Sequence, residues 1–549
     1  MQASDYLVFL LYFAIVSTYG YWVYNRKKSA TADSADYFLA EGSLTWWAIG
    51  ASLIASNISA EQFVGMSGSG FAMGLAIASY EWMAAVTLIV VAVFFLPIYL
   101  KNRIFTMPQF LSLRYNESVA LVMAVFWLFL YVFVNLTSIL HLGALAVSAI
   151  LGGPDYYMVC AIGLAIFALF ITLGGMKVIG YTDVIQVVVL IIGGLATTYL
   201  ALDKVSNGAG AMAGMKSVYA QAGDHFHMIL NKGQMLIPDG KGATKDAYMD
   251  LPGLTVLFGA MWIANLNYWG CNQYITQRAL GADLKTARSG LLFAAFLKVL
   301  MPIIVVIPGI AAYVIWKNGG LQTEMLNVKG YVQADRAYPV LLNLLPTGLK
   351  GLSFAALTAA IVASLAGKAN SIATIFSLDI YKKVINKNAT EKQLIDTGKI
   401  VIVAALVLAC IVAPQLKSLD QAFQFIQKYT GFVSPGIFAI FALGFFWKGT
   451  TSNAALAAAI ATLPISIYFD VAHPEMPFLI SMGYTFLALV TIMVVVSLAM
   501  PKKASVKIAG ESAEKVMEID PEMFKVSNGF AVGALLVLGI VAALYALFW

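Results

Sequence analysis

The chain has 549 residues, of which 60% are hydrophobic and only 11% are charged. An average soluble protein is about one quarter charged, so these charges are too few to solvate a water-soluble particle of this size. The composition therefore predicts a protein of the lipid bilayer. The net charge of +6 does not indicate a nucleic-acid partner, because the basic residues are scattered in short clusters between apolar runs.

About fourteen apolar segments follow one another along the chain, each long enough to cross a membrane as a helix of about 20 residues. The first lacks a basic leader and a small-residue cleavage site, so we expect it to be a retained helix. Transmembrane strands would alternate apolar and polar residues, which these segments do not. The expected fold class is an all-α polytopic membrane protein. The segments span 5–24, 46–70, 75–100, 118–150, 155–174, 180–202, 252–275, 288–317, 345–380, 397–415, 420–447, 452–470, 475–500 and 527–548.

Clusters of Lys and Arg indicate which loops are cytoplasmic. They follow the first, third, seventh, ninth and thirteenth segments, and this alternation predicts that both termini and the long loop 203–250 face outside. The clusters are Arg26, Lys27 and Lys28; Lys101 and Arg103; Arg278, Lys285 and Arg288; Lys382, Lys383 and Lys387; and Lys502, Lys503 and Lys507.

Two segments carry polar residues at mid-membrane depth. Such groups are costly in lipid unless they line a cavity or pair within the protein. Two interrupted helices about five segments apart are typical of transporters built from inverted repeats. The alternative is plain helix packing through small residues such as Gly70 and Gly74. The polar residues are Ser56, Asn57, Ser59, Glu61 and Gln62 in the second segment, and Asn265, Asn267, Asn272 and Gln273 in the seventh.

Five ionisable residues lie inside segments, and each is a candidate functional group. Glu81 and Lys298 are embedded in apolar helices, and opposite charges at similar depth suit a hydrated pocket that binds a polyhydroxylated solute. Tyr268 and Trp269 suit the apolar face of a sugar ring. Buried ion pairs and core packing are the alternative interpretations. The other three ionisable residues are Glu61, Asp183 and Lys368.

Other function classes find little support in the residues. The four histidines form no catalytic pattern, which disfavours an enzyme, and no phosphate-binding loop of the GxxxxGK type is present. Cys160, Cys271 and Cys410 lie far apart and predict neither a disulfide framework nor a zinc site. A sensor would need an output domain, for which the chain leaves no room after its last segment. We expect no organic cofactor.

Several strings, in this order, carry a resemblance that covers nearly the whole chain. GASLIASNISAEQFVGMSGSG, YWGCNQYITQR, AAFLKVLMP and NSIATIFSLDIYK resemble the sodium/solute symporter family, and most of all its sodium/galactose and sodium/glucose carriers. The resemblance implies a LeuT-type core of two inverted five-helix repeats. The implied divisions are a leading helix and loop (1–45), a first repeat with the outer loop (46–250), a second repeat (251–450) and three additional helices (451–549).

The resemblance also implies a site, carried over position by position. The residues implied to bind sugar hydroxyls are Gln62, Glu81, Asn265, Lys298 and Gln427. Tyr268 is implied to stack beneath the sugar as an inner gate, and Met66, Tyr80 and Phe423 to close over it from outside. The implied sodium ligands are the carbonyls of Ala55, Ile58 and Ala360 and the hydroxyl of Ser364. Asn57 and Asp183 match residues that support the sugar and ion regions.

Three departures from the family pattern affect the ion and the sugar. Ala363 replaces the first of two adjacent serines found at the ion site of the bacterial sodium/galactose carrier. Lys368 stands one helical turn after Ser364, where that carrier has an apolar residue. Lys368 is expected to pair with Asp183, to compete with sodium, to replace it as a fixed charge, or to extend toward the cytoplasmic end. Ala84 replaces a serine near the sugar, which weakens an assignment to galactose in particular.

The resulting prediction is a symporter that imports a monosaccharide resembling galactose, glucose or mannose. The sodium gradient would drive import by alternating access. The alternative is a proton-coupled or ion-independent sugar or polyol carrier of the same fold. The expected location is the plasma membrane, as a bacterial inner-membrane protein. The sequence does not predict the particular sugar, the ion stoichiometry or the oligomeric state.

Overall fold

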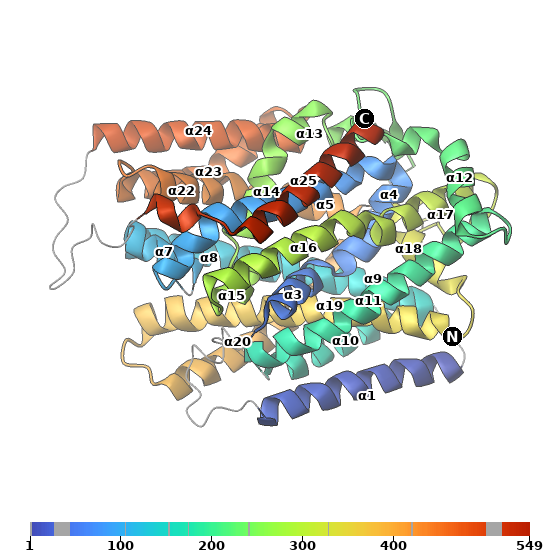
Figure 1. Ribbon diagram of the computed structural model, residues 1–549, viewed down its shortest axis with the longest axis horizontal. Helices are drawn as coiled ribbons and strands as arrows, with labels where there is room; N and C mark the ends of the chain where they lie inside the picture. Colours follow the sequence, from blue (N-terminus) through green and yellow to red (C-terminus); the bar gives the residue numbers. More distant parts are fainter. Residues whose placement is uncertain are drawn as a thin grey trace.

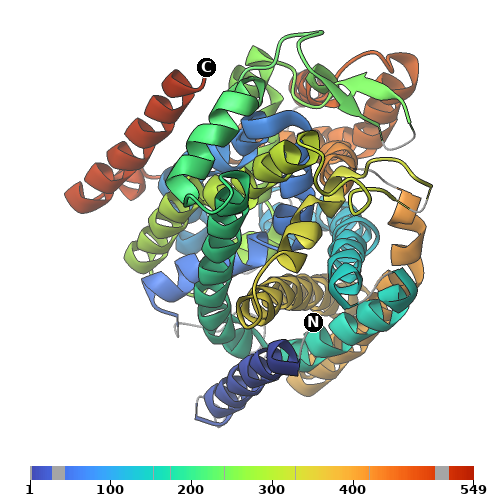
Figure 2. The ribbon, with the colours of Figure 1, turned by 90° about the vertical axis from the view of Figure 1, so that its right-hand side faces the viewer.

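The computed structural model describes residues 3–26, 44–104, 106–151, 154–173, 175–239, 242–327, 329–418, 421–500 and 519–549. Almost all of the described regular structure is helical, as predicted. One small antiparallel sheet pairs β1 (Leu236–Pro238) with β2 (Thr244–Asp246). The long helices run roughly along one axis, from end to end of the molecule (Figure 1), and Figure 2 views this bundle from one end.

The first half of the chain forms a leading helix and the helices up to the long loop. Their bounds are α1 (Ala3–Arg26), α3 (Trp46–Asn57), α4 (Ser67–Met73), α5 (Ser79–Val90), α6 (Leu96–Lys101), α7 (Met107–Arg114), α8 (Glu117–Phe129), α9 (Thr137–Leu151), α10 (Tyr157–Leu173) and α11 (Gly175–Val205). Wider π-helical turns link some of them: η1 (Glu61–Met66), η3 (Val91–Phe95) and η4 (Leu130–Leu136). The 3-10 turn η2 (Gly74–Ala78) joins α4 to α5.

The second half begins in the long loop. Its helices are α12 (Ala211–Gln221), α13 (Leu254–Phe258), α14 (Ala260–Gly270), α15 (Gln273–Leu280), α16 (Leu284–Val305), α17 (Ile307–Lys317), α18 (Ala337–Asn343), α19 (Leu349–Ile375) with its wide turn η9 (Phe376–Ile385), α20 (Glu391–Val412), α21 (Ala422–Gly431), α22 (Ser434–Phe446), α23 (Ser452–Ala472), α24 (Phe478–Ala499) and α25 (Asn528–Leu547).

The number of membrane spans differs from the predicted fourteen. By length and composition, ten helices among the described residues can cross a membrane, or twelve if two bent pairs each count as one span. Each predicted segment nevertheless contains helix. The difference arises because Tyr157–Leu173 is shorter than a full span, and because the helical run Glu61–Lys101 includes parts of two predicted segments. The four-part division of the chain stays a prediction.

The first interrupted helix breaks within the predicted polar run. Helix α3 ends at Asn57, and Ile58 is extended, with φ −82° and ψ 93°. The backbone N–H of Ser59 then donates to Gln62 Oε1 at 3.2 Å instead of to the carbonyl of Ala55. The carbonyls at the end of α3 are thereby available to other partners.

The second interrupted helix breaks later than its polar residues suggest. Helix α14 is intact through Asn265 and Asn267, and the chain breaks at Cys271, before α15. Asn272 begins α15 by accepting a hydrogen bond from the backbone N–H of Tyr274 at 3.1 Å. A further bend of 79° separates α13 from α14. The polar residues correctly indicated which helix is interrupted, but Asn265 and Asn267 lie within the continuous helix α14 and not at its break.

Gly70 and Gly74 differ in what they do, although both fit a small-residue packing pattern. At Gly70 a Cβ would come 2.7 Å from the carbonyl oxygen of Val306, so this glycine allows close helix contact. Gly74 has φ +70°, and a Cβ there would come 2.2 Å from the carbonyl oxygen of His225. The packing interpretation therefore holds for Gly70, whereas Gly74 ends α4 where the long loop packs against it.

Both termini lie at the same end of the molecule as α12 (Figure 1). The long loop binds the C-terminal end directly, since the N–H of Met228 donates to the carbonyl of Phe548 at 2.7 Å. Arg288, predicted to be a loop cation, is buried and donates to three carbonyls, among them those of Met523 and Lys525. The burial of Arg288 differs from its prediction, whereas the shared end of the two termini agrees with the prediction that both lie on one side of the membrane; which side that is stays a prediction.

Candidate functional site

A cavity lies between the two interrupted helices and the helices packed around them. We call it the central cavity. All the residues predicted to bind or gate a sugar line it, together with Asn57, Lys368 and Ala84. Its lining is Asn57, Glu61, Gln62, Met66, Tyr80, Glu81, Ala84, Asn135, Ala264, Asn265, Tyr268, Trp269, Asn272, Lys298, Lys368, Phe423, Ile426, Gln427, Thr430, Gly431, Ser434, Phe478, Leu479 and Met482.

Glu81 and Lys298 form an ion pair in the wall of the central cavity. The Lys298 Nζ lies 2.6 Å from Glu81 Oε2, and both side chains are almost fully buried. The same ammonium donates to Asn57 Oδ1 and lies 5.4 Å from the ring centroid of Trp269. The pair places a charged acceptor and a charged donor side by side without net charge, which suits recognition of neutral hydroxyl groups.

Asn57 connects this ion pair to Tyr268. Its Nδ2 donates to the hydroxyl oxygen of Tyr268 at 3.1 Å, while its Oδ1 accepts from Lys298. The end of α3 is thus joined to both α14 and α16 by one side chain. Any movement of Tyr268 must break or carry along the Asn57 contact.

The three predicted outer-gate residues pack into a buried part of the cavity lining. The rings of Tyr80 and Phe423 meet edge to face, with centroids 5.2 Å apart and an interplanar angle of 88°. Met66 is fully buried. Gly65 allows η1 to approach α21 closely, because a Cβ there would lie 2.9 Å from the Phe423 Cβ. Their role as a gate stays a prediction.

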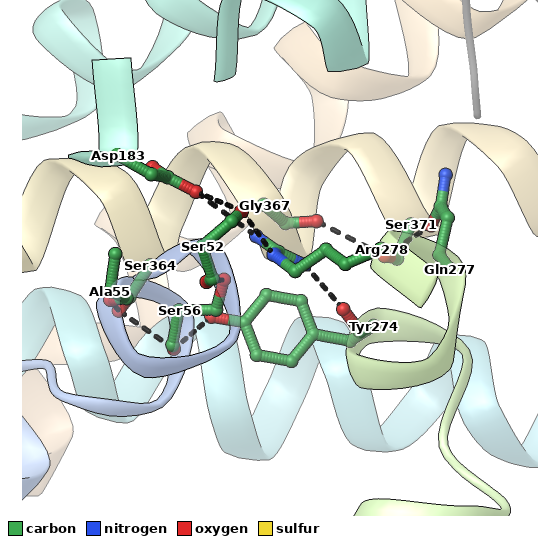
Figure 3. A network of polar contacts seen from close by, with 10 residues as sticks. All are labelled: Ser52, Ala55, Ser56, Asp183, Tyr274, Gln277, Arg278, Ser364, Gly367 and Ser371. Atoms are coloured by element: carbon green, nitrogen blue, oxygen red, sulfur yellow. Dashed lines mark hydrogen bonds and ion pairs between the residues drawn. The ribbon is translucent and has the colours of Figure 1, made fainter. Parts of the chain in front are cut away.

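Two of the predicted sodium ligands, Ala55 and Ser364, meet where α3 ends against α19 (Figure 3). Ser364 Oγ lies 3.3 Å from the Ala55 carbonyl oxygen and 3.0 Å from that of Ser56. The Ser56 carbonyl, absent from the predicted set, also accepts from the Tyr274 hydroxyl. Ile58 begins the extended turn after α3, and Ala360 precedes Ser364 by one turn; both are buried. Ala363 is buried beside Ser364 and brings no oxygen ligand in its side chain.

A second charged pair lies next to this position (Figure 3). Ser52 Oγ donates to Asp183 Oδ2 at 2.5 Å and accepts from Arg278 Nε at 3.0 Å. An Arg278 guanidinium nitrogen lies 3.9 Å from the same carboxylate oxygen, and both side chains are 1% exposed. The prediction that Arg278 is a loop cation is therefore wrong, because α15 turns its side chain into the protein.

Lys368 neither pairs with Asp183 nor extends toward the cytoplasmic end, which were two of its predicted positions. Asp183 is engaged with Ser52 and Arg278, so the predicted Lys368–Asp183 pair is not formed. Lys368 is 3% exposed, so its side chain does not extend to the cytoplasmic surface. Its ammonium donates to Asn135 Oδ1 at 3.1 Å and lies 4.1 Å from the ring centroid of Tyr274. The amide of Asn135 and the aromatic face of Tyr274 thus take the place of water around the buried ammonium.

Comparison with known proteins now decides the family. Residues 37–462 match the model of the Sodium:solute symporter family. The chain belongs to this family. It is 46% identical to the sodium/glucose cotransporter of Vibrio parahaemolyticus, over 99% of this chain and 98% of the relative. It is 34% identical to the sodium/myo-inositol cotransporter 2 of Mus musculus, over 85% of this chain and 70% of that protein.

The fold of this symporter is also shared with solved structures. A Na+-coupled sialic acid symporter in a substrate-bound outward-open state superposes with a TM-score of 0.75 at 21% identity, covering 91% of this chain and 98% of the other. An inward-facing structure of the transporter Mhp1 gives a TM-score of 0.52 at 15% identity. These likenesses confirm the predicted LeuT-type fold.

Sequence reasoning missed several residues that face the central cavity of the symporter or its ion position. Asn135 and Asn272 both line the cavity, yet the sequence pattern singled out Asn272 without a role and did not single out Asn135; Arg278, predicted to be a loop cation, is buried. Asn135 had a usable signal, since it interrupts a long apolar segment with an amide. Arg278 had none, because an arginine at the end of a span has the same sequence context whether it points outward or inward.

Proposed function

We propose that this symporter imports a monosaccharide together with sodium, by alternating access across the plasma membrane of a bacterium. The observation that carries the proposal is the buried Glu81–Lys298 pair, which lines a cavity between two interrupted helices. The family supports coupling to sodium, and the sodium/glucose cotransporter of Vibrio parahaemolyticus, similar over nearly its full length, supports a sugar. No covalent change of the solute is part of the proposal.

The polar side chains of the central cavity divide the work of binding. Gln62, Asn265 and Gln427 donate and accept hydrogen bonds to sugar hydroxyls, while Glu81 accepts and Lys298 donates. The Tyr268 ring stacks on the sugar and must move aside for release toward the cytoplasm. Met66, Tyr80 and Phe423 cover the sugar from the outer side.

Sodium binds between the end of α3 and α19. Its ligands are the carbonyls of Ala55, Ile58 and Ala360 and the hydroxyl of Ser364, since oxygen ligands suit a hard cation. The ion drives import only if it binds one conformation more tightly than the other. A membrane potential adds about 2.3 kcal/mol per charge for each 100 mV.

Orientation follows from the charge pattern. Both termini and the long outer loop face away from the cytoplasm, because the exposed basic residues mark the opposite loops, namely Lys101, Arg103, Lys285, Lys382 and Lys387. Most of the cavity lining comes from residues 46–250 and 251–450, which we propose are the two inverted repeats, and α24 adds Phe478, Leu479 and Met482. Residues 1–45 precede this core, and 451–549 follow it.

Uptake into proteoliposomes tests this function. Radiolabelled D-glucose, D-galactose, D-mannose and myo-inositol are offered with an inward gradient of sodium, and then of potassium. We expect at least one sugar to accumulate only with sodium, and Asn265→Ala to abolish that uptake. Lys525→Met, in an exposed ion pair with Glu522, is the control and should transport normally. Accumulation driven by a proton gradient without sodium, or equilibration indifferent to both ions, would contradict the proposal.

A further inference from the structure

Lys368 is the cation at the centre of a cluster of three tyrosines. Its Nζ lies 4.1 Å from the ring centroid of Tyr274, 5.1 Å from that of Tyr131 and 5.9 Å from that of Tyr268. Asn135 Oδ1 accepts a hydrogen bond from it at 3.1 Å. An ammonium is attracted to the faces of aromatic rings, and the attraction is stronger where water is excluded.

Two of these tyrosines hold the end of α3. The Tyr274 hydroxyl donates to the Ser56 carbonyl, which also lies 3.0 Å from Ser364 Oγ at the ion position. The Tyr268 hydroxyl accepts from Asn57, whose Oδ1 accepts from Lys298 in the sugar-binding wall. Successive residues of α3 thus face the ion and the sugar through two rings of one cluster.

The third tyrosine fixes the other interrupted helix. The Tyr131 hydroxyl donates to Asn272 Oδ1, the same atom that accepts from the backbone N–H of Tyr274. Lys368 itself extends from α19, the helix that carries Ser364. Its ammonium therefore lies where both helix breaks, η4 and the ion-binding helix meet. Arg278 also lies over the Tyr274 ring, at 4.9 Å from its centroid, and adds a second cation to this junction.

We infer that Lys368 is a positioning residue that couples the ion position to the sugar cavity. Its tethered charge keeps Tyr274 on the Ser56 carbonyl and Tyr268 on Asn57, so that occupation of the ion position is transmitted to the sugar gate. The inference rests on the proposed function. It predicts that without this charge the two sites still form but respond to each other weakly.

Sugar binding to the purified symporter, measured with and without sodium, tests the inference. The probe is the sugar from the uptake panel that accumulates most, with potassium chloride replacing sodium chloride at equal ionic strength. We expect sodium to tighten sugar binding by about tenfold in the native protein, a usual size for coupling between sites. Lys368→Met keeps the length of the side chain but removes its charge. In this variant we expect sodium to change the affinity for the sugar by less than about twofold.

Two further variants separate charge from packing. Lys368→Arg keeps a cation that stacks on tyrosine and should retain most of the sodium effect. Lys368→Ala should lose the effect and regain it with added methylammonium, which can enter the tyrosine cluster. Lys525→Met, in the exposed ion pair with Glu522, is again the control.

The inference is overturned if Lys368→Met keeps the native sodium effect. It is also overturned if Lys368→Arg loses as much as Lys368→Met and methylammonium restores nothing, because the side chain would then act by packing alone. Where Lys368→Met does not fold, Lys368→Arg and Lys368→Ala with methylammonium decide the matter. A native protein without any sodium effect would contradict the proposed function itself, an outcome visible before any variant is compared.

Discussion

Two buried lysines face the central cavity, and their surroundings differ. Lys298 is paired with a carboxylate, Glu81, at 2.6 Å. Lys368 lies among tyrosine rings and one amide, with Tyr274 nearest. Among the described residues no carboxylate oxygen lies within 4.0 Å of Lys368, although Glu61 lines the same cavity.

The difference shows two ways to keep a cation inside a membrane protein. A carboxylate fixes both the position and the direction of an ammonium, which suits a group that must hydrogen-bond a substrate. Aromatic faces attract the charge without a single fixed direction, so the ammonium can follow a moving helix. The first environment suits recognition, and the second suits transmission of movement.

The largest effect should come from breaking the Glu81–Lys298 pair. Glu81→Gln leaves the ammonium without its counter-charge, and removing one partner of a buried pair costs about 3–5 kcal/mol. We expect a lower thermal unfolding midpoint in detergent and loss of sugar uptake. Glu81→Gln combined with Lys298→Met should recover much of the midpoint but none of the uptake. If Glu81→Gln alone unfolded at the same midpoint temperature as the native protein, the ion pair would not contribute to stability.

His225 is a buried base outside the helices that can cross a membrane. Burial lowers its pKa from 6.5 to about 4, although a hydrogen bond to the Phe71 carbonyl and the nearby Asp224 oppose the change; Lys317 nearby adds to it. Because the folded pKa lies below the unfolded one, the packed loop keeps its stability above pH 6.5 and loses it as pH falls toward 4.

Acidification from pH 7.5 to pH 5 should therefore weaken packing of the His225 loop by about 2 kcal/mol. Amide hydrogen exchange of residues 223–228, corrected for intrinsic rates, measures this. His225→Phe keeps a ring on Tyr313, which lies 4.0 Å away between centroids, and should remove the pH effect. An equal pH effect in both proteins would assign it to another group.

Tyr274→Phe probes the tyrosine environment of Lys368 with a smaller change. The ring and its attraction for the ammonium stay, while the hydrogen bond to the Ser56 carbonyl is lost. Stability should fall by about 1 kcal/mol, the usual net value of such a bond. The sodium concentration for half-maximal uptake should rise, because Ser56 stands next to Ala55 and Ser364. An unchanged sodium requirement would separate Tyr274 from the ion position.

The smallest effect should come from an exposed ion pair. Lys428 and Asp470 lie 2.5 Å apart, but both are more than one third exposed. Water and salt screen such a pair, so Lys428→Ala should change stability by less than about 1 kcal/mol. Uptake should be close to native, which makes this variant a reference for the two buried lysines. If Lys428→Ala lost as much stability and uptake as Glu81→Gln, the burial of an ion pair would not determine how large its effect is.

Much of the site could be predicted from the sequence because polar residues in apolar segments are conspicuous. Gln62, Glu81, Asn265 and Lys298 all stand out in this way, and all line the central cavity. The location of the second helix break could not be predicted, because Asn265 and Cys271 belong to the same polar stretch. Side-chain polarity shows where lipid is excluded, not where the backbone leaves the helix.

The sequence by itself determined that the chain is an all-α membrane protein with polar groups at mid-depth, since hydropathy is a local property. Only the tertiary structure decided which charges meet. Glu81 pairs with Lys298 across 217 positions of the chain, Asp183 lies next to Arg278, and Lys368 lies among tyrosines. These partnerships depend on the rotation and tilt of helices far apart in sequence. A shift of one helical position would exchange partners while leaving every hydropathy pattern unchanged.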